Sequence, residues 1–191
     1  MPSSRRSGHR TIYPHVFLYL GAQNSLENAK SEEDGSFSGF LGCIVFTAFF
    51  LEAYLNHAGS ELIDSWGSDS ERLVPKSKLR LVSESVGFNI DYSSPAYQAF
   101  GDAFLVRKQV AHGKPTTTTA EWNPSRHGNL GHSKFEEVWE RYSTERHAER
   151  IFKGAEQLVI GLNECVAPGT HPFISGWSGF SWGPPDPAQA T

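Results

Sequence analysis

Arg107 and His112 are two residues whose types and spacing fit a chemical step. Four residues separate them within the stretch 100–115. A guanidinium keeps its charge and holds a phosphate through paired hydrogen bonds, and an imidazole exchanges protons near neutral pH. RNA cleavage by the 2′-hydroxyl needs a base, an acid and positive charge on the phosphate, without a protein nucleophile or a metal. The pair therefore suits this reaction.

The stretch that carries the pair is predicted to be a helix ending near the histidine. Ser94 and Pro95 fit an N-cap followed by proline at the first helical position, and Gly113 fits a helix stop. At about 100° per residue, one side of this helix holds Phe100, Ala103, Phe104, Arg107 and Ala111. An arginine in an apolar stripe requires an anionic partner, a water-filled opening or a ligand, because a buried unpaired charge is costly.

A second predicted helix, residues 37–57, is apolar on almost every side. Such a helix lies at the centre of a bundle, packs a partner subunit, or does both. Glu52 is its polar exception. This carboxylate either sits at the helix edge, reaching solvent or pairing with an arginine, or it anchors and orients Arg107.

The arginine, four spacers and histidine at a helix end, followed by Gly113 and Lys114, resemble the signature of the HEPN family. These are small helical-bundle proteins, many of them metal-independent endoribonucleases of toxin–antitoxin, CRISPR and phage-defence systems. The segment 46–56 also resembles the apolar first helix of the family, which carries one polar residue.

The resemblance implies an all-α fold, a HEPN-like bundle of four to five helices, and endoribonuclease activity of the toxin or defence type. It implies that Arg107 stabilises the phosphate, that His112 transfers protons, and that Lys108 and Lys114 attract the RNA backbone. On this hypothesis Glu52 takes the second of its two roles and orients Arg107. One copy of the motif supplies half of an acid–base pair, so the resemblance also implies a homodimer that joins two motifs in one cleft. No metal or cofactor is expected.

Two other hypotheses remain open. Family members often have Asn or Asp directly after the arginine, whereas this chain has Lys108 and a net charge of −4. These features favour a non-catalytic HEPN-like module that binds a nucleotide or a partner protein, such as an antitoxin or a nucleotidyltransferase. The third hypothesis is a helical-bundle interaction protein in which Arg107 and Glu52 form a structural ion pair.

The composition of the 191-residue chain predicts one domain with irregular flanks. We predict a disordered basic N-terminus (1–12), a helical domain (13–166) with a long loop (113–132), and an irregular tail rich in Pro, Gly and Trp (167–191). An apolar stripe that changes side near Ser143 predicts either a helix break there or one long helix with two neighbours. Ser133 and Glu136 fit a capping box at the start of the helical segment that leads to Ser143.

Net charge and hydropathy limit the partners and the compartment. The acidic balance gives no global attraction for nucleic acid, so RNA binding requires a local basic patch. Lys76, Lys78 and Arg80 form either a solvated helix face or such a patch. The apolar run 40–51 is shorter than the roughly 20 residues of a membrane span, so we expect a cytoplasmic protein without a membrane partner. Cys43 and Cys165 are expected to be buried free thiols.

Overall fold

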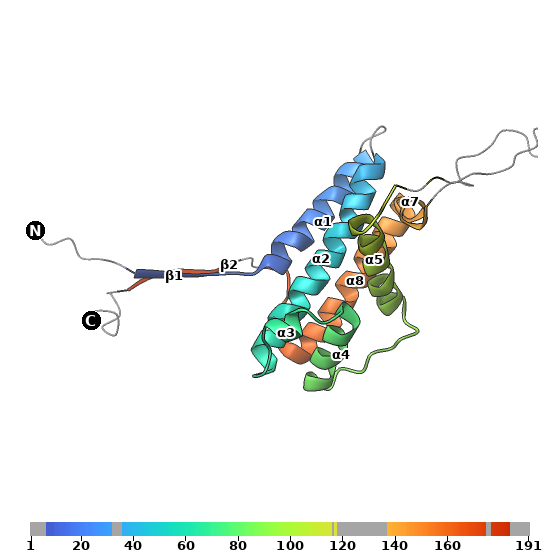
Figure 1. Ribbon diagram of the computed structural model, residues 1–191. Helices are drawn as coiled ribbons and strands as arrows, with labels where there is room; N and C mark the ends of the chain where they lie inside the picture. Colours follow the sequence, from blue (N-terminus) through green and yellow to red (C-terminus); the bar gives the residue numbers. More distant parts are fainter. Residues whose placement is uncertain (1–6, 32–35, 116, 118–136, 175–176, 184–191) are drawn as a thin grey trace, which may run out of the picture.

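The computed structural model describes residues 7–31, 36–115, 117, 137–174 and 177–183. Within these ranges the chain is mostly helical, as the all-α prediction requires (Figure 1). The elements are β1 (Ser7–Ile12), α1 (Pro14–Ser31), α2 (Ser36–Leu62), α3 (Ser68–Glu71), α4 (Pro75–Val86), α5 (Pro95–Ala111), α7 (Val138–Tyr142), α8 (Glu145–Val166) and β2 (Trp177–Gly183).

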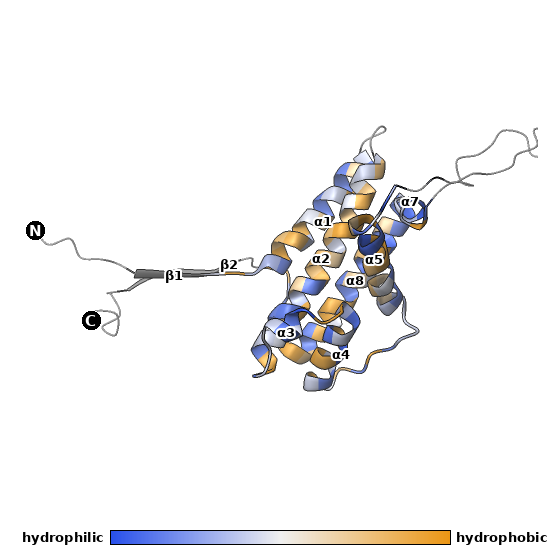
Figure 2. Ribbon diagram, in the orientation of Figure 1, coloured by the Kyte–Doolittle hydropathy of each residue, from blue (hydrophilic) through white to orange (hydrophobic). Residues whose placement is uncertain are grey.

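Helix α2 is the centre of the bundle. It packs against α1, α4, α5 and α8, and Figure 2 shows it apolar along most of its length. Ile44, Phe50 and Leu51 are almost fully buried. A helix with neighbours on several sides needs apolar residues around most of its circumference, which explains the pattern that the sequence shows.

Part of α2 nevertheless keeps apolar rings at the surface. Phe46 and Phe49 are each 38% exposed, and Phe17 and Leu20 of α1 are exposed as well. The helix is 27 residues long, and its most apolar 18-residue window has a mean hydropathy of 1.7. By length and composition alone α2 could cross a membrane, although half of that window is buried inside the bundle. The helix thus extends well beyond the apolar run 40–51 on which the expectation of no membrane partner rested.

Helix α5 begins and ends as the sequence predicts. The Ser94 Oγ accepts a hydrogen bond from the Tyr97 backbone N–H at 3.2 Å, and proline occupies the first turn. At the other end His112 is the C-cap residue, whose backbone N–H donates to the Lys108 carbonyl. The capping residues therefore fix both ends of the helix that carries Arg107.

A polar contact ties α5 to α7 and α8. The carboxylate of Asp102 on α5 accepts hydrogen bonds from the Tyr142 hydroxyl at 3.1 Å and from the Arg150 guanidinium at 2.6 Å. Burial raises the pKa of the Tyr142 hydroxyl, and the Asp102 charge raises it further. These bonds orient α5 about its own axis, because they hold one face of it against two other helices.

The C-terminal helical region is broken rather than continuous. Helix α7 ends at Tyr142 and α8 begins at Glu145, so the two apolar stripes belong to separate helices. The predicted capping box at Ser133 and Glu136 lies outside the described residues. Helix α7 instead carries a capping box formed by Glu137 and Glu140.

The two ends of the described chain pair with each other. β1 and β2 form an antiparallel ribbon that projects away from the bundle (Figure 1), with Ser7 opposite Gly183 and Ile12 opposite Trp177. The sequence predicts a disordered stretch 1–12 and an irregular tail 167–191. For residues 7–12 and 177–183 this prediction is wrong, because the two segments are paired strands. Strand pairing between such distant segments is non-local, so local pattern does not reveal it.

Helices α5 and α8 approach each other closely at Gly154. A Cβ placed there would lie 2.5 Å from the Ala99 Cβ and 3.2 Å from the Pro95 carbonyl oxygen. Gly161, on the same helix, has more room, since its Cβ would meet the Phe88 ring at 3.6 Å.

We expect Gly154→Ala to lower the free energy of unfolding by about 1–2 kcal/mol, because overpacking outweighs the gain in helix propensity. Gly161→Ala is the matched control and should raise it by about 0.5–1 kcal/mol. Denaturant unfolding of both variants measures the difference. Equal stability of the two variants would contradict this close contact between α5 and α8.

Candidate functional site

A fully buried lysine lies beside the predicted site. The Lys78 side chain on α4 is 0% exposed, and its Nζ donates to the Glu52 Oε1 at 2.9 Å. Glu52 lies on the central helix α2 and keeps 24% of its side chain exposed. An ammonium without solvent must have an anionic partner, and Glu52 is that partner.

The second oxygen of Glu52 faces the motif arginine. The Arg107 Nη2 lies 3.6 Å from Glu52 Oε2, and 34% of the arginine side chain is exposed. Its guanidinium carbon also lies 5.6 Å from the centre of the Phe49 ring, a cation–π distance. Lys78, Glu52 and Arg107 thus form one cluster of alternating charge, which we call the Glu52 cluster.

The Glu52 cluster is closed at one end and open at the other. Lys78 is sealed inside, while a third of Arg107 faces solvent. The contact between Arg107 and Glu52 fits both a structural ion pair and a catalytic role for Arg107. An ion pair can stabilise the bundle, and it can also hold a guanidinium ready to bind an anion.

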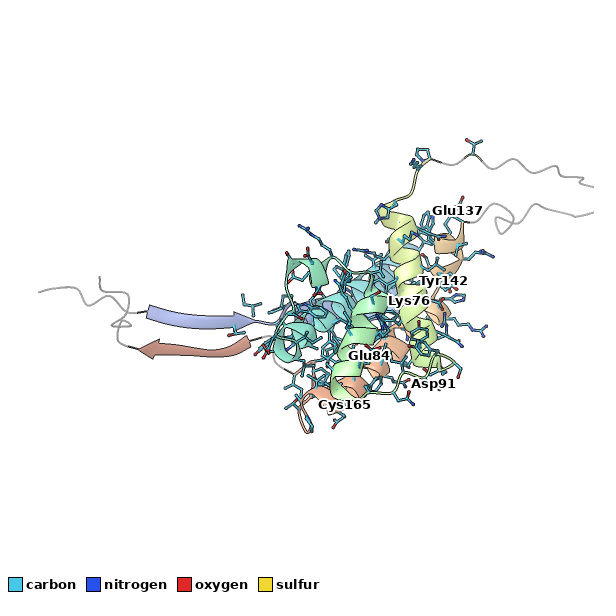
Figure 3. The ribbon with its side chains drawn as sticks, turned by 60° about the horizontal axis from the view of Figure 1, so that its bottom comes forward. Lys76, Glu84, Asp91, Glu137, Tyr142 and Cys165 are labelled. Carbon is cyan, nitrogen blue, oxygen red and sulfur yellow. The ribbon has the colours of Figure 1, made fainter. Side chains whose placement is uncertain are left out.

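His112 lies in a different setting. It is exposed, and it lines a cleft of about 380 Å³ together with Lys108 and Lys114. Glu137 and Trp139, at the start of α7, form the opposite wall. Figure 3 shows Glu137 beside the end of α5. The structure therefore brings three of the predicted site residues together.

Arg107 is not among the residues that line this cleft. Five residues along an α-helix correspond to a rotation of about 140° around its axis. Arg107 consequently faces α2, whereas His112 faces α7.

Lys78 is the residue that sequence reasoning misplaced. It was grouped with Lys76 and Arg80 as a solvated face or RNA patch, but its burial excludes it from contact with RNA in this conformation. Lys76 is exposed, and Arg80 pairs with Glu84 at 3.2 Å across an exposed helix face. The helical spacing of α4 could have indicated this burial, because Lys78 lies four residues before Val82 and therefore on the same buried stripe.

Within the described residues, no cluster of three or more His, Cys, Asp or Glu side chains could hold a metal ion. Cys43 is buried, and burial raises the pKa of its thiol to about 12. Cys165 is exposed near the end of α8, which differs from the expected buried thiol. Cys165 lies in the last turn of α8 and is not among the buried residues of that helix.

A second group of titratable side chains lies near the start of α1. His15 is 3% exposed, and its ring stacks on His57 with centroids 5.2 Å apart. Burial, with a smaller contribution from His57, lowers the pKa of His15 to about 4. Burial also lowers the pKa of His57, although Glu61 opposes this shift. Both imidazoles are therefore neutral at physiological pH.

Comparisons with known proteins return no relative for this chain. No family model matches the sequence, and neither curated proteins nor solved structures contain a significant match.

We expect Glu52→Gln to lower the free energy of unfolding by about 2–4 kcal/mol, because the buried Lys78 ammonium then lacks a counter-charge. Arg107→Gln should cost only about 0.5–1 kcal/mol, since that residue is partly solvated. The double variant Glu52→Gln with Lys78→Met should recover most of the loss. Denaturant unfolding of the three variants tests this, and equal costs for Glu52→Gln and Arg107→Gln would refute it.

Acid should destabilise the fold through His15. Its pKa falls from 6.5 to about 4 on folding, so the unfolded chain binds the proton more tightly between these values. The resulting stability is present above pH 6.5 and is lost as pH falls to about 4, by roughly 2–3 kcal/mol. The difference between the stability–pH curves of wild type and His15→Phe measures this contribution. Parallel stability–pH curves for the two proteins would show that the pKa of His15 is the same in the folded and unfolded chain, and would contradict the prediction.

Proposed function

We propose that this chain is a metal-independent endoribonuclease of the HEPN type, with a HEPN-like bundle, acting in the cytoplasm as a toxin or defence effector. The proposal rests on the resemblance of the Arg107–His112 motif. The observation that carries it is the combination of a partly exposed Arg107, held by Glu52, with an exposed His112 at the end of the same helix.

The chemistry assigns a role to each side chain. The 2′-oxygen of the RNA attacks the adjacent phosphorus, the bond to the 5′-oxygen breaks, and a 2′,3′-cyclic phosphate and a 5′-hydroxyl form. His112 accepts the proton of the 2′-hydroxyl or donates one to the leaving oxygen. Arg107 stabilises the negative charge on the phosphate. Glu52 holds the guanidinium in place.

A second copy of the chain completes the site. The angular separation of Arg107 and His112 around α5 supports a composite cleft, because Arg107 is absent from the described residues that line the His112 cleft. Exposed apolar side chains on α5 and α2, namely Leu105, Val110 and the Phe49 ring beside Arg107, supply apolar surface near the motif for a partner. A twofold axis near α5 would bring two arginines and two histidines together.

Local charge supports binding of the RNA backbone. Lys108 and Lys114 line the same cleft as His112, so two ammonium groups lie near the acid–base group. With a net charge of −4, the remainder of the chain contributes no general attraction. We therefore expect modest affinity that falls steeply with salt.

A second candidate function is favoured by the same cleft. It holds His112, Lys108 and Lys114 without Arg107, and two lysines with a histidine can bind the phosphate of a nucleotide without cleaving RNA. A non-catalytic HEPN-like module of this kind could act with a partner protein such as a nucleotidyltransferase antitoxin. Stoichiometric nucleotide binding or a stable complex, without nuclease activity, would favour it.

Purified protein should cleave single-stranded RNA in the presence of EDTA and leave 2′,3′-cyclic phosphate ends. Arg107→Ala and His112→Ala should each lower the rate by about a hundredfold or more, because each removes a group that acts in the transition state. Gel analysis of labelled RNA measures the rate and identifies the ends.

Lys153→Ala is the matched control, since Lys153 is an exposed cation on α8 that pairs with Glu149 and does not line the His112 cleft. It should keep the wild-type rate. Sedimentation of each variant checks that the oligomer persists. Equal rates for wild type and both motif variants, or no cleavage by any of them, would refute the proposal.

A further inference from the structure

A cavity of about 690 Å³ lies at the far end of the bundle from His112. Residues from α1, α2 and α8 line it, together with the segment 170–174 that follows α8. Its volume falls in the range of small-molecule sites. None of the nuclease residues takes part in it, so its role is independent of the proposed function.

Hydrogen bonds fix the walls of this cavity. The Tyr54 hydroxyl donates to the Asn163 Oδ1 at 3.1 Å, and the Asn163 Nδ2 donates to the Thr170 carbonyl at 3.0 Å. These bonds tie α2 to α8 and to the segment after it. The polar network therefore fixes the position of Thr170, which lines the cavity.

His15 supplies a buried acceptor beneath this cavity. Its Nε2 lies 3.1 Å from the Pro172 carbonyl, which can only accept, so Nε2 carries the hydrogen. In the neutral ring Nδ1 is then an acceptor, and Nδ1 is buried without a hydrogen-bond partner among the described residues. A ligand N–H group is the kind of donor that this atom lacks.

Aromatic rings surround that acceptor. His57 stacks on His15, Tyr13 meets the His57 ring edge-on with centroids 5.2 Å apart, and Tyr54 meets His15 edge-on at 5.5 Å. Ring faces of this kind attract cations. They also accommodate a flat or aliphatic ligand body.

The charge of the lining is the deciding feature. Glu61, one helical turn after His57, supplies its carboxylate, and the described residues that line the cavity include no lysine or arginine. Glu61 forms no ion pair within 4.0 Å among the described residues. The lining thus disfavours phosphates and carboxylates and favours a positively charged group.

We propose that this cavity binds a small organic amine in its ammonium form. The ammonium group pairs with Glu61, its N–H bonds face the imidazoles of His15 and His57, and its carbon body packs on Tyr13 and Tyr54. Tyr54, His57 and Glu61 lie on α2, His15 lies on α1, and Tyr13 directly precedes α1, so the site is a feature of the fold rather than of a single side chain.

Benzylamine is a suitable probe, because it combines an ammonium group with one ring, and benzyl alcohol is its uncharged isostere. Isothermal titration of the full chain should give saturable millimolar or tighter binding of benzylamine, and at least about fivefold weaker binding of benzyl alcohol. Glu61→Gln should weaken benzylamine binding by a similar factor. Because Glu61 is exposed, this variant should fold, and its thermal unfolding checks that.

Glu164→Gln is the matched control, since it removes an exposed carboxylate of α8 that does not line the cavity. It should bind benzylamine as the wild type does. Absence of saturable binding to the wild type, equal affinity for benzylamine and benzyl alcohol, or equal effects of Glu61→Gln and Glu164→Gln would each overturn the proposal.

Discussion

The buried ammonium of Lys78 is the constraint on which the arrangement around the motif depends. A charge without solvent must stay close to its counter-charge, so α4 is held against Glu52 of α2. The same carboxylate faces Arg107 of α5 through its other oxygen. One acidic side chain on the central helix therefore contacts cations of two other helices, and the carboxylate that neutralises the buried Lys78 ammonium also holds the arginine.

The two ends of the bundle have opposite chemical character. At the C-terminal end of α5, His112 lies between Lys108 and Lys114, and this surface suits a phosphate. At the start of α1, two neutral imidazoles lie among tyrosines beside Glu61, and this cavity suits a cation. The described linings of the cleft and of the cavity have no residue in common.

The motif is divided between two faces of α5, and this division is the main functional consequence of the fold. Arg107 faces Glu52 of the central helix, and His112 lines a cleft with Glu137 and Trp139 at the start of α7. The division agrees with a composite site in a symmetric dimer. It agrees equally with the proposed binding of a nucleotide in the His112 cleft, so nuclease and binding assays on the same variants distinguish the two proposed functions.

The sequence by itself determined where α5 begins and ends, since the Ser94 cap is a local interaction. It also indicated that Arg107 needs an anionic partner, a water-filled opening or a ligand. Only the tertiary structure decided that Lys78 is buried on Glu52 and that Ser7–Ile12 pairs with Trp177–Gly183. It also decided that His15 and His57 stack. Capping and periodicity depend on neighbours along the chain, whereas burial of a charge and pairing of distant segments depend on which elements meet in space.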